Sequence, residues 1–371
     1  MNANEVRDAV RDAAAARAPL RIAGSGTWLD AGRPVHASRT LSLSHLTGIV
    51  NYEPGDFTLT ARAGTTLAEL ANATLPHRQF LSLDPFGDSN GTLGATVATG
   101  ANGPMAYAFG GPRDNVIGLE VVTGDGAVVR CGGRVVKNVA GFDLTRLFTG
   151  SWGTLGVVTE VSVRLRALPQ VDETYAIAVD DRPEKIGELI AGIRFVSIAP
   201  LAMELISPSP ALRVATPTLL VRLGGNEASV RAQQRVLASF GDAQQVAADI
   251  WQSLRGAEPP ATIVARVSTR PSRTIDAWTQ TREAINSASN ALLIASVGRG
   301  VVRCIVPQDA HDAARKLARC DATVIFERLP AELWSELAPS PVSGRLSRSV
   351  KDRFDPSHVL NPGVLGETVA Q

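Results

Sequence analysis

The chain has 371 residues, 44% of them hydrophobic, and 37 basic against 36 acidic residues leave a formal net charge of +1. A single hydrophobic core usually stops growing at about 250–300 residues, so this length predicts two domains. The balanced charge excludes a global basic field that would attract nucleic acid and an acidic bias that would attract polycationic partners. We therefore expect any ligand to be bound by a local group of residues.

The sequence pattern shows no targeting or membrane signal. The segment 1–19 carries charges every three or four residues instead of an apolar core, which argues against a signal peptide. No run of about 18 apolar residues occurs, so we expect no transmembrane segment. Three scattered cysteines without a CxxC pattern fit a reducing compartment. We therefore expect a cytoplasmic protein, and attachment to the inner face of the membrane through a partner subunit stays open.

Up to residue 131, short strands alternate with short helices. The pattern predicts a helix from Asn2 or Asn4 to before Pro19, strands at Leu20–Ala23, Thr40–Leu43 and Phe57–Ala63, a helix over Leu67–Leu75 with a Thr66/Glu69 capping box, and a hairpin of Ile117–Thr123 and Ala127–Cys131 around Gly124-Asp125-Gly126.

The stretch Gly132–Pro169 joins turns, a helix and a long strand without a linker. Asp143 is a good N-cap for a short helix, and Gly150 supplies its left-handed stop. The turn Gly153–Gly156 leads directly into a strand that begins at Val157. Apolar and polar residues then alternate up to residue 166, which predicts a half-buried strand.

Beyond Pro169, longer amphipathic helices alternate with strands, which predicts a separate α+β domain. The expected strands are Glu173–Val179, Leu219–Leu223, Thr262–Val267 and Val301–Val306, and the expected helices are Pro183–Arg194, Ala228–Phe240, Ala243–Leu254, Ser272–Ala288 and Asp309–Ala318, followed by Arg345–Phe354 in the tail.

Two glycine-rich segments are candidates for ligand binding. Gly24-Ser25-Gly26-Thr27 follows a strand, where consecutive backbone N–H groups can converge on an anion and glycine lets a pyrophosphate approach. A Rossmann fingerprint would need a glycine at position 29, which is leucine, so a simple tight turn is the alternative. In Gly91–Gly103, small residues expose backbone to a flat ligand or, alternatively, to another packed element.

Signals for other chemistries are weak. The five histidines show no ligand spacing, which predicts no metal site. No GxxxxGK[ST] or GxSxG motif occurs, and the five tryptophans lack interleaved basic residues, so we expect no nucleic-acid partner. Lys137 and Arg113 are cations in glycine-rich surroundings, for which a solvated loop charge is the alternative.

Together, these loops resemble the FAD-binding domain shared by p-cresol methylhydroxylase and vanillyl-alcohol oxidase. The signatures that match are Gly24–Trp28, Pro85 followed by Thr92–Ala95 and Gly103-Pro104, Gly153–Glu160, and the tail motif Asn361-Pro362-Gly363. Within this family, Lys137–Leu144 preceded by Gly132–Val135 is most similar to the FAD-binding E subunit of bacterial glycolate oxidase.

The resemblance implies an α+β fold. A p-cresol methylhydroxylase-type FAD-binding domain of two α+β subdomains, divided near residues 45–55, would occupy residues 1–169. A smaller α+β cap-like domain would follow at 170–340, and a tail at 341–371 would return to the FAD domain. The pyrophosphate would lie against Gly24–Trp28 and Gly94–Thr96, and the adenine near Gly156–Val158. This chain has Gly94-Ala95 at a position where members of the family commonly have two glycines.

The resemblance also implies the cofactor and its ligands. No histidine follows the first loop, where covalently flavinylated members carry one, which implies noncovalent FAD. The implied cofactor-binding residues are Gly24, Ser25, Gly26, Thr27, Trp28, Pro85, Thr92, Gly94, Ala95, Thr96, Thr99, Gly103, Arg113, Gly153, Gly156, Val157 and Val158.

The sequence departs from family members that oxidise 2-hydroxy acids by themselves. It lacks their histidine-containing cap segment, whereas hydride transfer to a flavin needs a base at the hydroxyl and a cation at the carboxylate. No catalytic residue is therefore assigned. The implied role is electron relay or assembly in a glycolate dehydrogenase complex, in which a sister FAD-containing subunit oxidises the 2-hydroxy acid and an iron–sulfur subunit passes electrons onward.

Two alternatives stay open. The first is a stand-alone FAD-dependent 2-hydroxyacid dehydrogenase, with Lys137 or Arg113 as the carboxylate partner. The second is a non-catalytic structural subunit whose FAD is vestigial or absent. Bound flavin in the purified chain would argue against the structural subunit. Bleaching of that flavin by glycolate, without partner subunits, would favour the stand-alone dehydrogenase over the electron relay.

Overall fold

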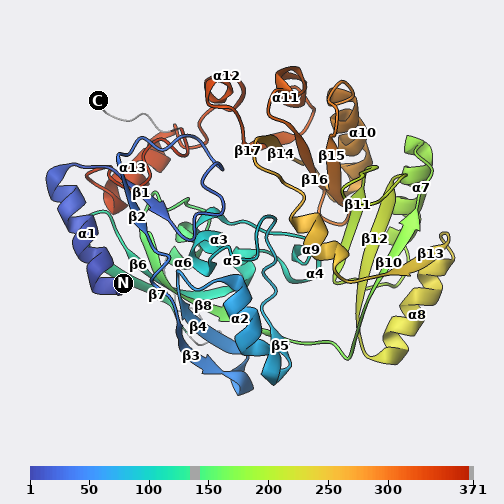
Figure 1. Cartoon of the computed structure of the whole chain (residues 1–371), viewed down its shortest axis with the longest axis horizontal. Coiled ribbons are helices and arrows are strands. Elements are labelled where there is room, and N and C mark those ends of the chain that lie inside the picture. Colours follow the sequence, from blue (N-terminus) through green and yellow to red (C-terminus); the bar gives the residue numbers. More distant parts are fainter. Residues whose placement is uncertain (134–142, 367–371) are drawn as a thin grey trace. The chain divides into compact units, whose positions relative to one another are not determined.

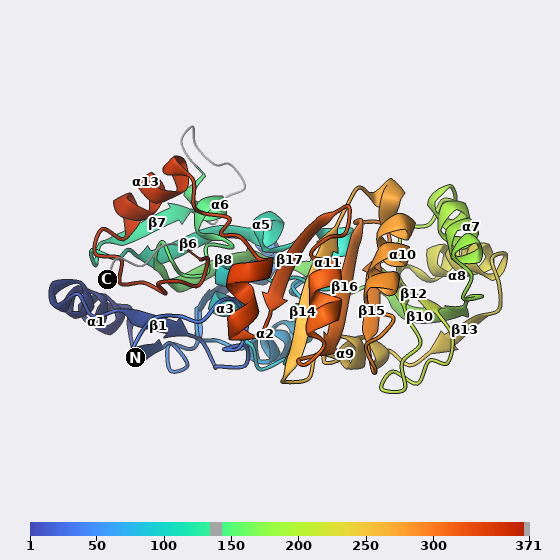
Figure 2. The same ribbon diagram turned by 90° about the horizontal axis from the view of Figure 1, so that it is seen from above.

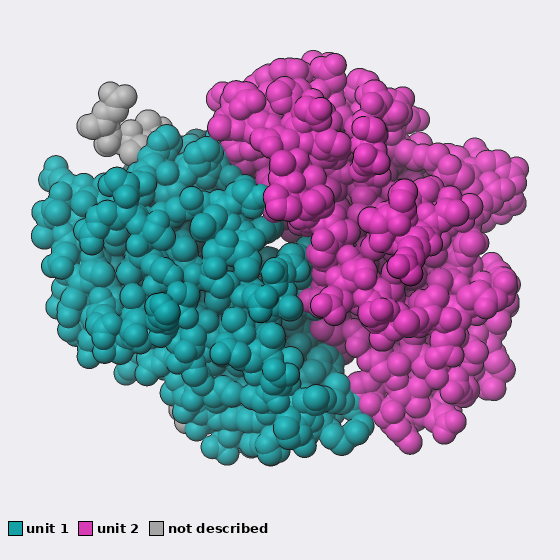
Figure 3. All heavy atoms as spheres, viewed as in Figure 1, with its two compact units in different colours: residues 1–103, 110–168, 339–371 teal, residues 104–109, 169–338 magenta. Residues whose placement is uncertain are grey.

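The computed structural model describes residues 1–133 and 143–366, and these divide into two compact units, which Figure 3 colours separately. Unit 1 comprises Met1–Gly103, the described part of Gly110–Leu168, and the described residues from Pro339 onward. Unit 2 comprises Pro104–Phe109 and Pro169–Ala338. Both units combine helices with antiparallel sheets, which confirms the predicted α+β class.

Unit 1 is built from short elements (Figure 1). In chain order they are α1 (Ala3–Ala16), β1 (Leu20–Ala23), β2 (Arg39–Ser42), β3 (Ile49–Glu53), η1 (Pro54–Asp56), β4 (Thr58–Arg62), α2 (Leu67–Thr74), η2 (Leu75–His77), β5 (Gln79–Phe80), α3 (Leu93–Thr99), α5 (Pro112–Asn115), β6 (Val116–Val122), β7 (Val128–Gly132), α6 (Leu144–Phe148), β8 (Val157–Arg164), β9 (Arg166–Ala167) and α13 (Arg345–Phe354).

The main sheet of unit 1 has the strand order β3-β4-β8-β6-β7, so β8 is its central strand. The predicted alternation holds from Thr159 onward: Thr159, Val161 and Val163 are fully buried, whereas Glu160, Ser162 and Arg164 are half-buried. Val157, at the start of the strand, is fully buried. Val158 is buried as well, at 4% exposure. Sequence alternation alone assigns Val158 to the solvent side of the strand. In the structure Val158 lines the candidate pocket described below.

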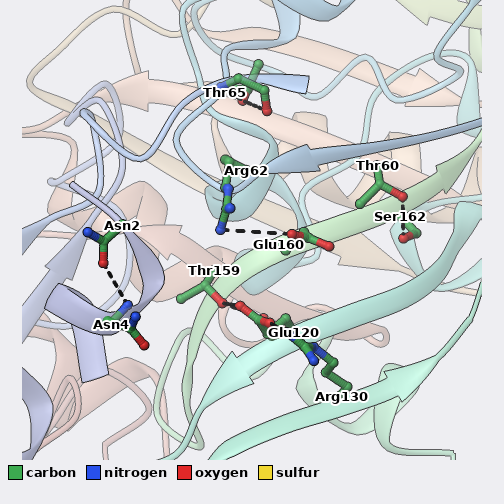
Figure 4. Close-up of polar contacts among 11 residues, drawn as sticks. Asn2, Asn4, Thr60, Arg62, Thr65, Glu120, Arg130, Thr159, Glu160 and Ser162 are labelled. Carbon is green, nitrogen blue, oxygen red and sulfur yellow. Dashed lines mark hydrogen bonds and ion pairs between the residues drawn. The ribbon is translucent and has the colours of Figure 1, made fainter. Parts of the chain in front are cut away.

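Polar cross-strand pairs hold the other face of this sheet (Figure 4). Arg130 Nη2 lies 2.6 Å from Glu120 Oε2, and Thr159 Oγ1 donates to Glu120 Oε1 at 2.9 Å. Thr159 is the extra residue of a β-bulge, because Glu120 pairs with Glu160 whereas Val121 pairs with Val158. On the other side of β8, the Thr159 carbonyl accepts from the Ala63 amide at 3.0 Å, which continues the regular pairing with β4.

Local capping rules explain several elements of unit 1. Asn2 caps α1, Thr66 and Glu69 form the predicted capping box of α2, and Asp143 caps α6 through the Arg146 amide at 3.1 Å. The predicted hairpin is confirmed, because β6 and β7 pair antiparallel around Gly126, whose φ is +76°. The predicted motif segment Lys137–Leu144 lies largely outside the described residues, since 134–142 are not described.

The C-terminal segment returns to unit 1. Helix α13, drawn in red in Figure 2, ends where the Gly124 amide donates to the Phe354 carbonyl at 2.8 Å, next to the turn of the β6–β7 hairpin. Lys351 Nζ donates to Asp355 Oδ2 at 2.7 Å and to the Thr154 carbonyl at 2.7 Å. Asp355 is fully buried, so this pair fixes the tail against the turn before β8.

Unit 2 contains longer elements around one large sheet. They are α4 (Ala106–Phe109), β10 (Val171–Ala178), α7 (Pro183–Arg194), β11 (Ala202–Ile206), β12 (Thr218–Gly225), α8 (Glu227–Ala238), β13 (Ala243–Val246), α9 (Ile250–Arg255), β14 (Thr262–Ser268), η3 (Pro271–Arg273), α10 (Thr274–Ala284), β15 (Leu292–Ser296), β16 (Val301–Pro307), α11 (His311–Leu317), β17 (Thr323–Arg328), η4 (Ala331–Leu333) and α12 (Trp334–Leu337).

The eight-stranded sheet of unit 2 has the order β13-β10-β12-β11-β15-β16-β14-β17. Helices α7, α8, α10 and α11 bury apolar residues in one core with it, including Ile186, Leu237, Trp278 and Leu317. The segment Pro104–Phe109 belongs to this unit, although unit 1 flanks it on both sides. Within the described residues, no helix is both long and apolar enough to span a bilayer.

One prediction for unit 2 was wrong, and three strands were not predicted. The expected helix Ala243–Leu254 is a strand, β13, followed by the short helix α9, because Ala243–Val246 pairs with the edge of β10. The strands that were not predicted are β11, β15 and β17. Strands β11 and β15 are buried at every position, so they lack the alternation that identifies a half-buried strand.

Candidate functional site

A pocket of about 150 Å³ lies within unit 1. Four segments far apart in the sequence line it: the end of β1 with the loop that follows, the segment from Pro85 through α3, the turn around Trp152–Gly156 with Val158, and the tail residues Asn361 and Val364. Ligand pockets commonly measure about 300–1,000 Å³, so this pocket has room for only part of a dinucleotide.

Most of the sequence-predicted site residues meet in this pocket. It is lined by Gly24, Ser25, Gly26, Thr27, Trp28, Pro85, Thr92, Gly94, Ala95, Thr96, Thr99, Gly153, Gly156 and Val158. Three predicted residues do not line it. Val157 points into the core at 0% exposure, Gly103 packs against the Asp84 carbonyl, and Arg113 is exposed and donates to the Thr149 carbonyl at 3.4 Å.

The loop after β1 presents unused backbone donors. Among the described residues, the amides of 25–28 have no hydrogen-bond partner, whereas the Ser25 hydroxyl donates to the Asn90 carbonyl at 2.7 Å. Gly26 has a φ of +83°, which favours glycine. A Cβ on Gly24 would collide with Thr92 Oγ1. The loop therefore has the chemistry of an anion site: exposed N–H groups at a position where no side chain fits.

The second glycine-rich segment forms a helix, α3, which was not predicted. Its first amides are already used: Leu93 donates to the Thr65 carbonyl at 2.9 Å, Gly94 to the Ala63 carbonyl at 2.8 Å, and Thr96 to the Thr92 carbonyl at 3.0 Å. A Cβ on Gly94 would lie 2.6 Å from the Ala63 Cβ. Close packing on β4 thus explains Gly94, and the expected backbone contact of Gly94–Thr96 with a pyrophosphate has no free amide hydrogen to make it.

Two tryptophans form an aromatic wall. The rings of Trp28 and Trp152 stack with centroids 5.9 Å apart at an interplanar angle of 22°. Trp152 and Gly153 both adopt positive φ, at +55° and +67°. A Cβ on Gly32 would lie 2.9 Å from the Trp152 ring, so Gly32 allows the ring to take this position.

Sequence reasoning missed Trp152 and Asn361 as pocket residues. The Asn361 Oδ1 accepts from the Ile22 amide at 2.7 Å, and its Nδ2 donates to the Trp152 carbonyl at 2.7 Å. Their signals were present in the motifs Ser151-Trp152-Gly153 and Asn361-Pro362-Gly363. What the sequence could not show is that the tail lies beside β1.

The pocket contains little ionisable chemistry. Arg21 and Asp88 are the charged residues among those that line it, and Arg21 Nη2 donates to the Leu29 carbonyl. Within the described residues, no group of three or more histidine, cysteine or acidic side chains is arranged to hold a metal. Lys137 lies outside the described residues. The pocket is therefore suited to holding a ligand through backbone donors, aromatic rings and small side chains.

Comparison with known proteins shows the class of protein to which this chain belongs. Residues 1–132 match the family model of the FAD binding domain. The fold is that of p-cresol methylhydroxylase, whose structure with bound substrate superimposes with a TM-score of 0.77 at 15% identity, covering 98% of this chain and 87% of that one. The fold and the family model together define an FAD-binding flavoprotein of the p-cresol methylhydroxylase type.

The relatives narrow this class. The chain is 36% identical to glycolate oxidase subunit GlcE of Escherichia coli over 258 residues, covering 69% of this chain and 68% of that protein. It is 34% identical to glycolate oxidase subunit GlcD of Bacillus subtilis over 206 residues, which span 42% of that protein. The chain belongs to the family of glycolate oxidase subunit GlcE and is an FAD-linked oxidoreductase. The predictions of family, fold and FAD are confirmed.

Proposed function

We propose that this chain is the FAD-binding subunit of a glycolate dehydrogenase complex that oxidises glycolate to glyoxylate. The observation that carries the proposal is the 36% identity to Escherichia coli GlcE across two thirds of both chains. The shorter match to GlcD supports a common origin with a second kind of subunit of the same named enzyme. In the complex, FAD supplies the acceptor for two electrons.

We assign the residues of the pocket to parts of a noncovalently held FAD. The free amides of Ser25–Trp28 would donate to the pyrophosphate, where glycine lets the phosphate oxygens approach the backbone. Gly156 and Val158 would line the adenine end. Thr92, Thr96 and Thr99 lie on the α3 side and would contribute contacts other than backbone amides. Gly103, Arg113 and Val157 are left out of this assignment.

We further propose that oxidation of the 2-hydroxy acid takes place on a sister FAD-containing subunit. A base must reach the substrate hydroxyl and a cation its carboxylate. Both charged residues that line the pocket of unit 1 are engaged in local hydrogen bonds: Arg21 donates to the Leu29 carbonyl, and Asp88 Oδ1 accepts from the Asn90 amide at 2.8 Å. This composition supports electron relay or assembly as the role of the chain, with an iron–sulfur subunit receiving the electrons in the cytoplasm or at the inner face of the membrane.

The purified chain tests the cofactor and the role separately. We expect a yellow protein that releases flavin on acid treatment, and we expect glycolate to leave that flavin oxidised until the sister subunit is added. A colourless chain that takes up no FAD on reconstitution would contradict the cofactor assignment. Bleaching of the flavin by glycolate in the isolated chain would overturn the relay and favour the stand-alone dehydrogenase.

Copurification tests the partners. We expect the tagged chain to bring down a second flavoprotein and a subunit that contains iron and acid-labile sulfide, with flavin present on both flavoproteins. Recovery of the tagged chain without partners would contradict the proposed complex, but it would not contradict the proposed binding of FAD. A complex with flavin only on the sister subunit would support the purely structural alternative.

A further inference from the structure

The C-terminal segment from Asp355 to Gly366 forms part of the pocket wall. The Leu20 amide donates to the Val359 carbonyl at 2.7 Å, the Asn361 amide donates to the Leu20 carbonyl at 3.0 Å, and Leu20 pairs with Leu360 in a parallel bridge. The segment therefore runs beside β1 like an additional short strand. This brings Asn361 and Val364 to the pocket from the far end of the chain.

The Asn361 side chain links two pocket elements, the end of β1 at Ile22 and the turn at Trp152. Its Oδ1 accepts from Ile22, two residues before the Gly24 loop, and its Nδ2 donates to Trp152, whose ring stacks on Trp28. The amide carries its acceptor and its donor on two separate atoms, so one side chain can bond both groups at once, and a protonated carboxyl shares this property. Asn361 also adopts a φ of +43°, which asparagine tolerates better than most residues.

The turn at Trp152 is shaped around this side chain. A Cβ on Gly153 would lie 2.9 Å from Asn361 Nδ2, so glycine at this position gives the amide room. Trp152 is held at a φ of +55°, an uncommon conformation for a bulky residue that surrounding contacts must maintain. The hydrogen bond from Asn361 to the Trp152 carbonyl is one of these contacts.

The tail does not depend on Asn361 for its attachment. Lys351 and Asp355 form a buried pair, and Asp355 also accepts from the amides of Val359 at 3.1 Å and Leu360 at 2.9 Å. The His36 amide donates to the Pro362 carbonyl at 2.9 Å. These bonds hold the backbone on both sides of Asn361, so a change of its side chain acts on the pocket rather than on the course of the tail.

We propose that Asn361 is a positioning residue of the cofactor pocket, which couples the loop after β1 to the Trp28–Trp152 wall and thereby sets the affinity for FAD. The proposal rests on the assignment of this pocket to FAD. On this proposal, the C-terminal tail contributes to the retention of FAD through the Asn361 side chain. This role is separate from any contribution of the tail to the stability of unit 1.

The first test compares Asn361→Ala and Asn361→Gly with Asn226→Ala. Asn226 caps α8 in unit 2 through the Ser229 amide at 2.8 Å, so its loss serves as a matched control for a lost asparagine hydrogen bond. We expect the Kd for FAD of the deflavinated chain to rise about tenfold in the Asn361 variants and to stay unchanged in the control. Asn361→Gly retains the left-handed backbone, so it reports on the side chain if Asn361→Ala folds poorly.

The second test uses Asn361→Asp and pH. A protonated carboxyl can accept from Ile22 and donate to the Trp152 carbonyl as the amide does, whereas the carboxylate cannot donate. We therefore expect the ratio of the variant's Kd to that of the wild type to be about tenfold at high pH and to fall as the pH is lowered. The charged or ionisable side chains near this site include Arg21 on β1, Arg33 and His36 beside the tail, and the Lys351–Asp355 pair. They are present in both proteins, so the ratio of the two Kd values reports the change at position 361.

The stacked indoles supply a spectroscopic readout. We expect the circular dichroism contributed by the Trp28–Trp152 pair to change in Asn361→Ala, and to be recovered by Asn361→Asp at low pH. An unchanged Kd in Asn361→Ala and Asn361→Gly, or a Kd ratio for Asn361→Asp that is independent of pH, would overturn the proposal. If the wild-type chain itself bound no FAD, the pocket assignment would fail instead, so the two failures are distinct.

Discussion

The two units contain contrasting polar features: a buried network of charges in the sheet of unit 2, and exposed backbone donors in a loop of unit 1. In unit 2, Arg303 lies in the sheet at 6% exposure, bonded to Glu258 and 2.7 Å from Glu327. Burial alone would raise the pKa of Glu327, but Arg303 and Arg266 hold it below its ordinary value. In the pocket of unit 1, the loop after β1 instead leaves backbone donors unused.

This difference separates a structural cluster from a binding site. The carboxylates of Glu258 and Glu327 pair with Arg303, so this network holds the sheet together through charges of its own. The loop 24–28 has donors without acceptors and no side chains in the way, an arrangement that a bound anion completes.

The largest expected effect is on the pocket. Gly24→Val places a branched side chain where even a Cβ meets Thr92 Oγ1, so we expect the purified variant to contain no flavin. The measurement is the flavin released per chain by acid. Gly55→Ala is the control, because nothing lies within 4 Å of a Cβ at that position. Full flavin content in Gly24→Val would mean that the loop assignment is wrong.

The second prediction breaks the network of unit 2. Arg303→Met leaves two buried carboxylates without their shared partner, so we expect a loss of about 3–5 kcal/mol in the free energy of unfolding of unit 2. Denaturant unfolding measures this loss, with the exposed Arg182→Met as control. FAD affinity should not change. A variant of unchanged stability would show that the network is dispensable.

A third prediction compares helix caps in the two units. Thr92 accepts from the Ala95 amide at 3.3 Å and Asn226 from the Ser229 amide at 2.8 Å, so Thr92→Val and Asn226→Ala should each cost about 1 kcal/mol of stability. Only Thr92→Val changes a residue of the pocket, and we expect only this variant to weaken FAD binding in titrations. Equal FAD affinity in both would place Thr92 among purely structural residues.

The smallest effect concerns pH and the β6–β7 hairpin. The hydrogen bond from Thr123 to Asp125, at 2.6 Å, holds the pKa of Asp125 below its ordinary value. A lowered pKa in the folded state contributes stability above the pKa of the unfolded chain, and this contribution is lost as the pH falls through the folded value.

The change Thr123→Val should therefore raise the pKa of Asp125, measured by NMR titration of its side chain. The stability difference from the wild type should be present at neutral pH and shrink in acid. A difference that stays constant with pH would assign the loss to packing around Thr123 instead.

The sequence by itself determined the local features of this protein. Capping residues such as Asn2, Thr66 and Asp143, and the glycines of the first loop, act within a few residues along the chain, so their structural roles were predictable. Helices α7 and α13 were predicted with the bounds that the structure shows. Helix α7 buries Ile186, Leu189, Ile190 and Ile193, a stripe that the local sequence pattern displays.

Tertiary structure alone decided the rest. Buried strands β11 and β15 lack alternation, and β13 forms because β10 offers it a free edge. The first amides of α3 donate to the carbonyls of Ala63 and Thr65 in the turn after β4, which no local pattern encodes. Asn361 enters the pocket because the tail pairs with β1 at Leu20, more than 300 residues earlier in the chain. Such contacts depend on which surfaces meet, and that information is distributed over the whole fold.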